Sequence, residues 1–153
     1  ICLRATCRRR AQTCKREDVD LDLLCSVLQP RAELFTDIPE QVDFIDKLPE
    51  YSLELYNNKK MKTNAETSLD ALKKILPVLE GIDEFTQENV HDALFKLIEA
   101  EGVKNGVILF PLRVALSGKQ FTPGGGIEIS VILGKDDALA RIKKGIELLS
   151  AAQ

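Results

Sequence analysis

The most apolar run of the sequence contains one arginine and is followed within a few residues by a lysine and a cluster of glycines. Residues 107–116 are apolar except for Arg113, and a short polar stretch then leads to Lys119 and to the turn sequence at 122–126. A buried element that ends in such a loop can present cations from a rigid base, and glycines allow the backbone of a ligand to come close. If Thr122 begins the next helix, backbone amides there can also bind an anion. The simpler interpretation is a core helix followed by a turn.

A second group of cations lies at residues 57–62, where Lys59, Lys60 and Lys62 surround Met61. The simplest interpretation of this polar stretch is a solvated loop or helix end. The more specific interpretation is that the lysines bind the phosphates of a nucleic acid, because lysine and arginine supply many of the phosphate contacts in such complexes.

Residue sets typical of enzymes are missing. There is no G-x-S-x-G elbow, no P-loop and no H-E-x-x-H motif, and the glycines at 124–126 lack the G-x-G-x-x-G spacing of a dinucleotide site. His91 is the one histidine, and it falls off the apolar stripe of its predicted helix, so we expect a surface residue. The sequence therefore predicts no catalytic residue, no metal site and no cofactor in this chain.

All four cysteines lie in the first 25 residues, with the spacing C-x4-C-x6-C-x10-C. Zinc sites usually combine two short knuckles, and neither a second knuckle nor a nearby histidine is found here. No apolar stretch follows the basic residues near the start, so we expect no secretory signal and free thiols in the cytoplasm.

The chain begins at Ile1 rather than at a methionine, so we expect a fragment. No apolar run reaches the ~18 residues of a membrane span.

The net charge of -3 argues against a general nucleic-acid binder, but this charge is unevenly distributed. Residues 1–16 hold six basic and no acidic residues, so the rest of the chain carries -9. An acidic body can still hold local basic patches, and the sign of the total therefore does not decide the partner.

Apolar residues recur at helical spacing along most of the chain. The clearest helix follows Thr63-x-x-Glu66, which has the form of a capping box, and ends near Gly81. The other predicted helices cover 20–28 and 38–48, run from Thr86 to Gly102, include the apolar run at 107–116 and follow Gly134.

Two stretches are ambiguous. Residues 127–133 read IEISVIL, an alternation that on its own favours a strand, although Ile127 and Val131 also match a helix. Residues 51–56 alternate weakly and fit either a strand or a helix.

Longer motifs resemble a known family. The sequences LPEYSLELYNNKKMKTN and VKNGVILFPLRVALSGKQFTPGGGIEISVILGKDDALARI closely resemble the C-terminal part of bacterial glutamyl-tRNA synthetases, including the anticodon-binding domain. The stretch QPRAELFTDIPEQVDFIDKLPEY resembles the helical connecting domain that precedes it. The resemblance covers roughly residues 19–150, and residues 1–18 match less well. It implies an all-α fold, with helix at 127–133.

The predicted organisation is a helical connecting module at 1–55 followed by an all-α anticodon-binding domain, an α-helix cage, at 56–153. Pro49, the polar run after it and the capping box suggest the division. The HIGH-like and KMSKS-like motifs of the family's catalytic domain are absent, and the KMK sequence at 60–62 lacks the residues that complete the second motif. The resemblance therefore implies a non-catalytic fragment of a class I glutamate–tRNA ligase, whose ATP and Mg²⁺ would bind elsewhere in the full enzyme.

The resemblance also implies partners and site residues. The partners are the glutamate-specific tRNA, with the glutamine-specific tRNA left open, and the rest of the synthetase chain, with no membrane. Single-stranded bases are read by arginine side chains and loop backbone, and the family's anticodon contacts fall on Arg113, Thr122, Pro123 and Gly124. Phosphate contacts are expected for Lys119, Lys59, Lys60 and Lys62, and Arg31 is nearest to a connecting-domain arginine that reads the third anticodon base in some members. The competing hypothesis is an all-α protein-interaction module with no RNA role.

Overall fold

A computed structural model describes residues 23, 26, 43–45, 48, 50–119, 122 and 125–152. The cysteine-rich residues 1–18, Arg31, Pro123 and Gly124 lie outside the described residues, so the predictions made for them stay predictions. Of the predicted helix at 20–28, residues 23 and 26 are described and are helical, and residues 43–45 of the second predicted helix are helical too.

The described elements are helices. They are the 3-10 helix η2 (Leu53–Tyr56) and the α-helices α4 (Ala65–Glu80), α5 (Gln87–Glu101), α6 (Asn105–Ser117), α7 (Gly126–Leu133) and α8 (Lys135–Ala151). Within the described ranges the one β-type pairing is an isolated bridge between Asn58 and Thr63. The all-α prediction is therefore confirmed, and residues 51–56 contribute a helical turn. No described helix is long and apolar enough to cross a membrane.

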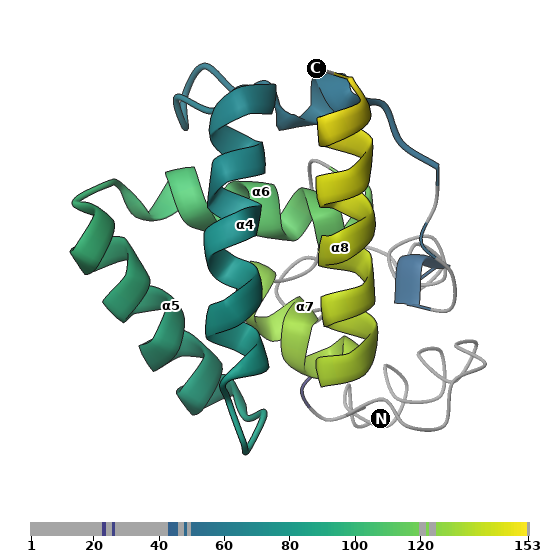
Figure 1. Cartoon of the computed structure of the whole chain (residues 1–153). Helices are drawn as coiled ribbons and strands as arrows, with labels where there is room; N and C mark the ends of the chain where they lie inside the picture. Colours follow the sequence, from purple (N-terminus) through teal and green to yellow (C-terminus); the bar gives the residue numbers. More distant parts are fainter. Residues whose placement is uncertain are drawn as a thin grey trace.

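Helices α4 and α8 lie side by side and run in opposite directions, and α6 crosses behind them (Figure 1). Helix α7 packs below α6, and α5 lies along the other side of α4. Apolar side chains from all five helices meet in one core, which includes Leu72, Leu94, Leu112, Ile129 and Ile142, each fully buried. The periodic stripes predicted for α4, α5 and α8 face this core.

The start of α4 differs by one residue from the prediction. The N-cap is Asn64 rather than Thr63, and the capping box pairs the Asn64 side chain with the backbone of Thr67, and the Thr67 side chain with the backbone of Asn64. The physical reason is that the backbone of Thr63 is already engaged, because its N–H and C=O pair with those of Asn58 at 3.0 Å each. The predicted ends at Gly81 and Gly102 and the N-cap at Thr86 are confirmed.

Residues 127–133 form helix α7, so the alternation that favoured a strand was misleading and the family resemblance was right. Neighbouring helices α5, α6 and α8 all pack against α7, and six of its eight residues are buried. A helix that is covered on most of its circumference is apolar at nearly every position, so it shows no helical period. Its polar Ser130 is accommodated because its hydroxyl donates to the carbonyl of Gly126 at 2.6 Å.

A tyrosine pair packs at the end of the bundle where η2 lies, with Tyr56 fully buried and Tyr51 half-buried. The hydroxyls of Tyr51 and Tyr56 lie 2.9 Å apart and their rings meet edge to face. Burial raises the pKa of the Tyr56 hydroxyl far above its ordinary value, with a further contribution from Tyr51, and burial raises the pKa of Tyr51 as well.

Because of this tyrosine pair, we expect the folded protein to become less stable at alkaline pH. Above pH ~10 the unfolded chain loses tyrosine protons that the folded protein keeps, so the free energy of unfolding falls as pH rises, by up to about 1.4 kcal/mol per pH unit for each retained proton. In urea unfolding from pH 9 to 11, Tyr56→Phe should show a correspondingly shallower fall than the parent. Equal slopes for the two proteins would contradict this assignment.

Candidate nucleic-acid interface

A groove of about 430 Å³ opens where α5, α6 and the start of α7 meet the loop at residues 57–62, which we call the basic loop. It combines aromatic, cationic, acidic and glycine surfaces. Its lining residues are Met61 of the basic loop, His91 and Phe95 of α5, Gly106, Leu109 and Arg113 of α6, and Gly125, Gly126, Ile127 and Glu128 at the start of α7.

Arg113 reaches this groove from the middle of α6 and is half-buried. Its guanidinium carbon lies 5.5 Å from the centre of the Phe110 ring, a cation–π distance that orients the planar group. The backbone that carries it is held at the end of the helix, because Ser117 donates its hydroxyl to the Arg113 carbonyl at 2.6 Å. The predicted arginine is therefore a fixed cation on the wall of the groove.

The floor of the groove is formed where α6 and α7 approach closely. A Cβ atom at Gly126 would lie 3.2 Å from the Leu109 carbonyl oxygen and from the Leu112 side chain, so this position requires a glycine or a shift of α7. Glu128 accepts a hydrogen bond from the Gly125 amide at 3.0 Å. This glutamate adds a carboxylate to the lining that also contains Arg113.

The expectation that Thr122 starts a helix with amides available to an anion was wrong. Helix α7 begins at Gly126 with Gly125 as its N-cap, and Thr122 lies ahead of it, only 3 % exposed. The Gly125 amide is satisfied by the protein's own carboxylate, Glu128. That carboxylate makes the helix start an unfavourable site for a phosphate.

The basic loop is held in a defined turn. The bridge between Asn58 and Thr63 closes it, and the Asn58 side-chain oxygen accepts the amides of Lys60 and Met61 at 3.0 and 3.2 Å. Lys62 has a φ of 54°, a left-handed conformation that tightens the turn. The side chains of Lys59, Lys60 and Lys62 are exposed.

Met61 brings the basic loop to the groove. Its sulfur would lie 2.3 Å from a Cβ atom at Gly106, so the methionine rests against the start of α6 at a position that has no side chain. The structure thus brings the loop that carries the three lysines against the groove through Met61, and the predicted phosphate contacts of these lysines stay predictions.

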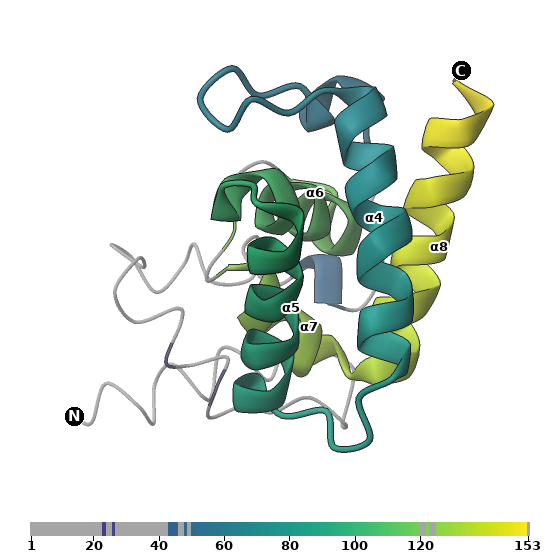
Figure 2. The ribbon, with the colours of Figure 1, turned by 60° about the vertical axis from the view of Figure 1, so that its left-hand side comes forward.

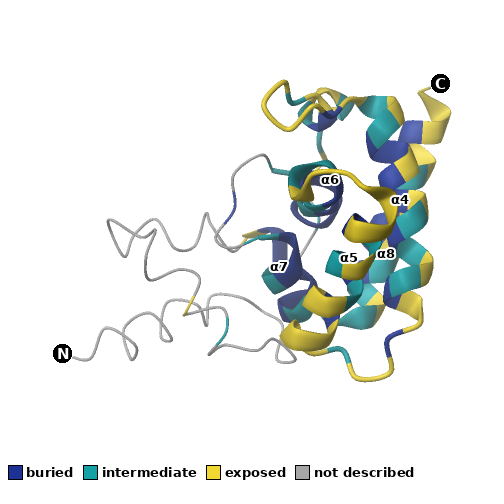
Figure 3. Cartoon of the chain, turned by 90° about the vertical axis from the view of Figure 1, so that its left-hand side faces the viewer, coloured by how far each residue is buried: buried dark blue, intermediate teal, exposed yellow. Residues whose placement is uncertain are grey.

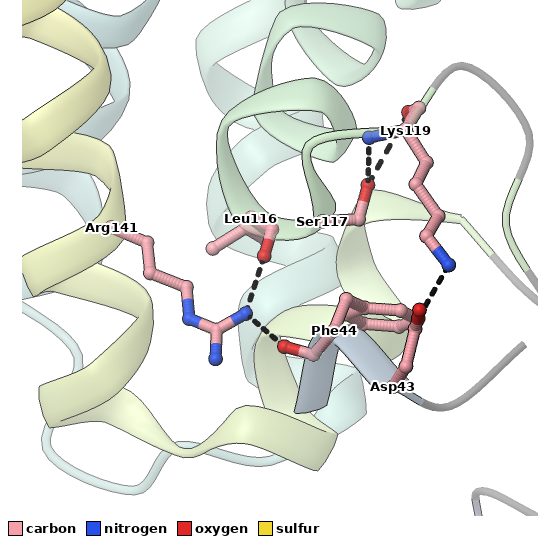
Figure 4. Close-up of polar contacts among 6 residues, drawn as sticks. All are labelled: Asp43, Phe44, Leu116, Ser117, Lys119 and Arg141. Atoms are coloured by element: carbon pink, nitrogen blue, oxygen red, sulfur yellow. Dashed lines mark hydrogen bonds and ion pairs between the residues drawn. The ribbon is translucent and has the colours of Figure 1, made fainter. Parts of the chain in front are cut away.

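Lys119 lies at a different place, beyond the end of α6. Gly118 adopts a left-handed conformation with φ of 65° and ends the helix, and the Lys119 amide then donates to the Ser117 hydroxyl at 3.2 Å. The Lys119 ammonium pairs with Asp43 and lies 5.8 Å from the centre of the Phe44 ring (Figure 4). A phosphate at Lys119 would therefore compete with Asp43, and its predicted role stays a prediction.

Arg141 of α8 is a buried arginine that bonds to residues 43–45 and to the end of α6. We did not single it out from the sequence. It is 5 % exposed, and its guanidinium donates to the carbonyls of Phe44 and Leu116 at 2.7 Å each (Figure 4). It also donates to the carbonyl of Ile45 at 3.1 Å. It also pairs with Asp137 at 3.1 Å, one turn earlier on α8. Arg141 thereby ties residues 43–45 to the end of the helix that carries Arg113.

We also did not identify from the sequence the two aromatic residues of α5 that line the groove, His91 and Phe95. His91 is exposed, as predicted, but it stacks on Phe95 with ring centres 4.1 Å apart and an angle of 20° between the ring planes. The i, i+4 spacing of two aromatic rings is the signal that could have revealed this pair. Among the described residues, no group of three or more His, Cys, Asp or Glu side chains could hold a metal ion.

Comparison with known proteins places this geometry in a family context. A family model described as an anticodon binding domain matches residues 6–146. Glutamate–tRNA ligases of Clostridium tetani and Clostridium acetobutylicum are 56 % and 53 % identical to the chain over 133 and 134 residues. These matches cover 87 % and 88 % of this chain, which spans only 27 % and 28 % of the length of these relatives.

Solved structures show the same fold. A glutamate tRNA ligase from Elizabethkingia meningosepticum, in complex with its amino acid, matches with a TM-score of 0.76 and 23 % identity, covering 97 % of this chain and 30 % of that one. The corresponding synthetase from Elizabethkingia anophelis matches with a TM-score of 0.69 and 21 % identity, over 95 % of this chain and 28 % of that one. The predicted boundary between residues 55 and 56 is not tested by these matches and stays a prediction.

Proposed function

This chain belongs to the anticodon-binding domain family, and from that premise we propose that it recognises the anticodon of a glutamate-specific tRNA as the C-terminal part of a glutamate–tRNA ligase. The names of the relatives and the share of their length that the chain spans support this proposal. Aminoacylation, and the ATP and Mg²⁺ that it requires, would then belong to the rest of the parent chain. A cytoplasmic location follows from the same proposal.

The observation that carries the proposal is the position of Arg113 in a groove that the basic loop meets through Met61. Unstacked RNA bases are recognised by hydrogen bonds to their edges and by stacking on planar side chains. A half-buried arginine can supply the hydrogen bonds, while exposed lysines attract the phosphates on either side without reading sequence. Arg113 in the groove and the lysines of the adjoining basic loop would supply these two kinds of contact.

The competing hypothesis of a protein-interaction module is not supported by the family match. It also makes a different prediction about salt, because binding of phosphates releases counterions and weakens as salt rises. Binding of an apolar helix to a groove would not weaken steeply.

Binding of the chain to a glutamate tRNA transcript should therefore weaken steeply with salt, and the basic loop should account for a defined part of this dependence. Replacing Lys59, Lys60 and Lys62 together with glutamine should reduce the slope of log Kd against log salt by about 2, at roughly 0.7 for each phosphate contact to a single strand. The measurement is filter binding or fluorescence anisotropy over a series of salt concentrations.

A matched control removes the same charge elsewhere. Lys73, Lys143 and Lys144 are exposed lysines of α4 and α8, two helices that contribute no residue to the lining, and their triple glutamine variant should leave the slope close to that of the parent. If the two triple variants lower the slope equally, the basic loop is no specific phosphate site. If the parent shows no salt-dependent binding, the proposed function is wrong.

A further inference from the structure

We propose that His91 and Phe95 form a stacking platform for one unpaired RNA base in the groove. The inference rests on the proposed function and adds to it a binding element on α5, a helix outside the predicted anticodon contacts. The ligand is a nucleobase presented by its flat face, so the platform contributes affinity without selecting a base by hydrogen bonds.

The geometry of α5 supports this inference. Val90, Leu94 and Ile98 face the core and are buried, whereas the His91 side chain is 51 % exposed on another face of the helix. Figure 2 shows α5 running beside α6 and α7, and Figure 3 shows exposed residues along α5 and buried residues on α7. Two stacked rings with an exposed outer surface therefore lie at the edge of a groove.

The other surfaces of the groove suit a base. Arg113 supplies a second planar group, already oriented by the Phe110 ring. The lining also includes the apolar side chains of Met61, Leu109 and Ile127, which offer apolar surface to a flat ring. Lys60 and Lys62 are exposed and flank Met61 of the lining in sequence, so they are available to the phosphates of an RNA strand that enters the groove.

A purely structural role for the ring pair is the alternative, since aromatic side chains four residues apart stabilise a helix. The two roles are separated by replacing His91, which is exposed and can be changed without opening the core. A structural role would change thermal stability and leave RNA binding unaffected. A platform would change RNA binding and would be restored by a larger ring.

The test compares His91→Ala and His91→Trp with the parent chain. Anisotropy would measure affinity for a glutamate anticodon stem–loop, and 2-aminopurine placed in turn at each anticodon position would report stacking by quenching. We expect His91→Ala to weaken binding about five-fold or more and to reduce quenching at one position, because loss of a stacking side chain typically has at least this effect. His91→Trp should restore both. Gln87→Ala, an exposed change on α5 outside the lining, is the matched control.

The inference is overturned if His91→Ala binds like Gln87→Ala. It is also overturned if His91→Trp fails to restore binding or if quenching is unchanged in His91→Ala, because histidine would then act through charge or hydrogen bonding. Failure of the platform and failure of the proposed function are distinguishable. If Arg113→Ala weakens binding while His91→Ala does not, only the platform is wrong, and if the parent does not bind the stem–loop, the proposed function fails.

Discussion

Replacing Arg141 with methionine should lower the free energy of unfolding by about 3–5 kcal/mol, because removing one member of a buried charged network leaves its partners uncompensated. Arg141 is 5 % exposed, and its guanidinium donates to three backbone carbonyls and pairs with Asp137. Methionine can fill much of the space but donates no hydrogen bond. Urea or thermal unfolding followed by circular dichroism measures the loss.

The control for this prediction is Lys143→Met on the same helix. Lys143 pairs with Glu80 at 3.2 Å, but both side chains are about half exposed, so the change should stay within about 0.5 kcal/mol. If both methionine variants unfold with the parent's free energy, Arg141 does not hold residues 43–45 to α6 in the way that its contacts indicate.

The second large effect is expected for Arg113→Ala, which should weaken tRNA binding by about 1–3 kcal/mol, or roughly 5- to 150-fold. The physical reason is the loss of a planar, partly buried donor group that is already oriented on the Phe110 ring. Titration of a glutamate tRNA transcript at fixed salt, with unfolding curves recorded in parallel, separates this loss from any loss of stability.

Arg113→Lys distinguishes base reading from simple charge. Lysine keeps the positive charge but lacks the planar fork that pairs with a base edge. We expect the lysine variant to keep most of the salt dependence and to lose discrimination against tRNA with a substituted anticodon. Full recovery of both affinity and discrimination in Arg113→Lys would show that Arg113 acts as a charge alone, and equal binding by Arg113→Ala and the parent would remove it from the site.

Several helices could be read from the sequence because their signals are local. The buried stripes of α4, α5 and α8 repeat every three or four residues, and the ends at Gly81 and Gly102 are marked by a residue type that suits a helix end. The one-residue error at the start of α4 arose from a contact of Thr63 with Asn58, which no capping pattern encodes.

The site was only partly predictable. Arg113 stood out as the one charge in an apolar run, and the basic loop stood out as a lysine cluster. Their meeting in one groove depends on Met61 lying against Gly106, residues that are far apart in sequence. The His91–Phe95 stack was visible in the sequence as an i, i+4 spacing. Its place in the groove, however, depends on the packing of α6 and α7 against α5.

The sequence by itself therefore determined the helical class, most helix ends, the family resemblance and the choice of Arg113 as a candidate site residue. At residues 127–133 the local alternation favoured a strand, and only the resemblance indicated the helix that burial on several sides explains. Tertiary structure decided that α7 begins at Gly126 rather than near Thr122, and that Arg141 binds the carbonyls of Phe44 and Leu116. The reason is the range of the interactions. Periodicity and capping act over three or four residues, whereas burial on several sides and hydrogen bonds to distant carbonyls exist only once the helices have packed.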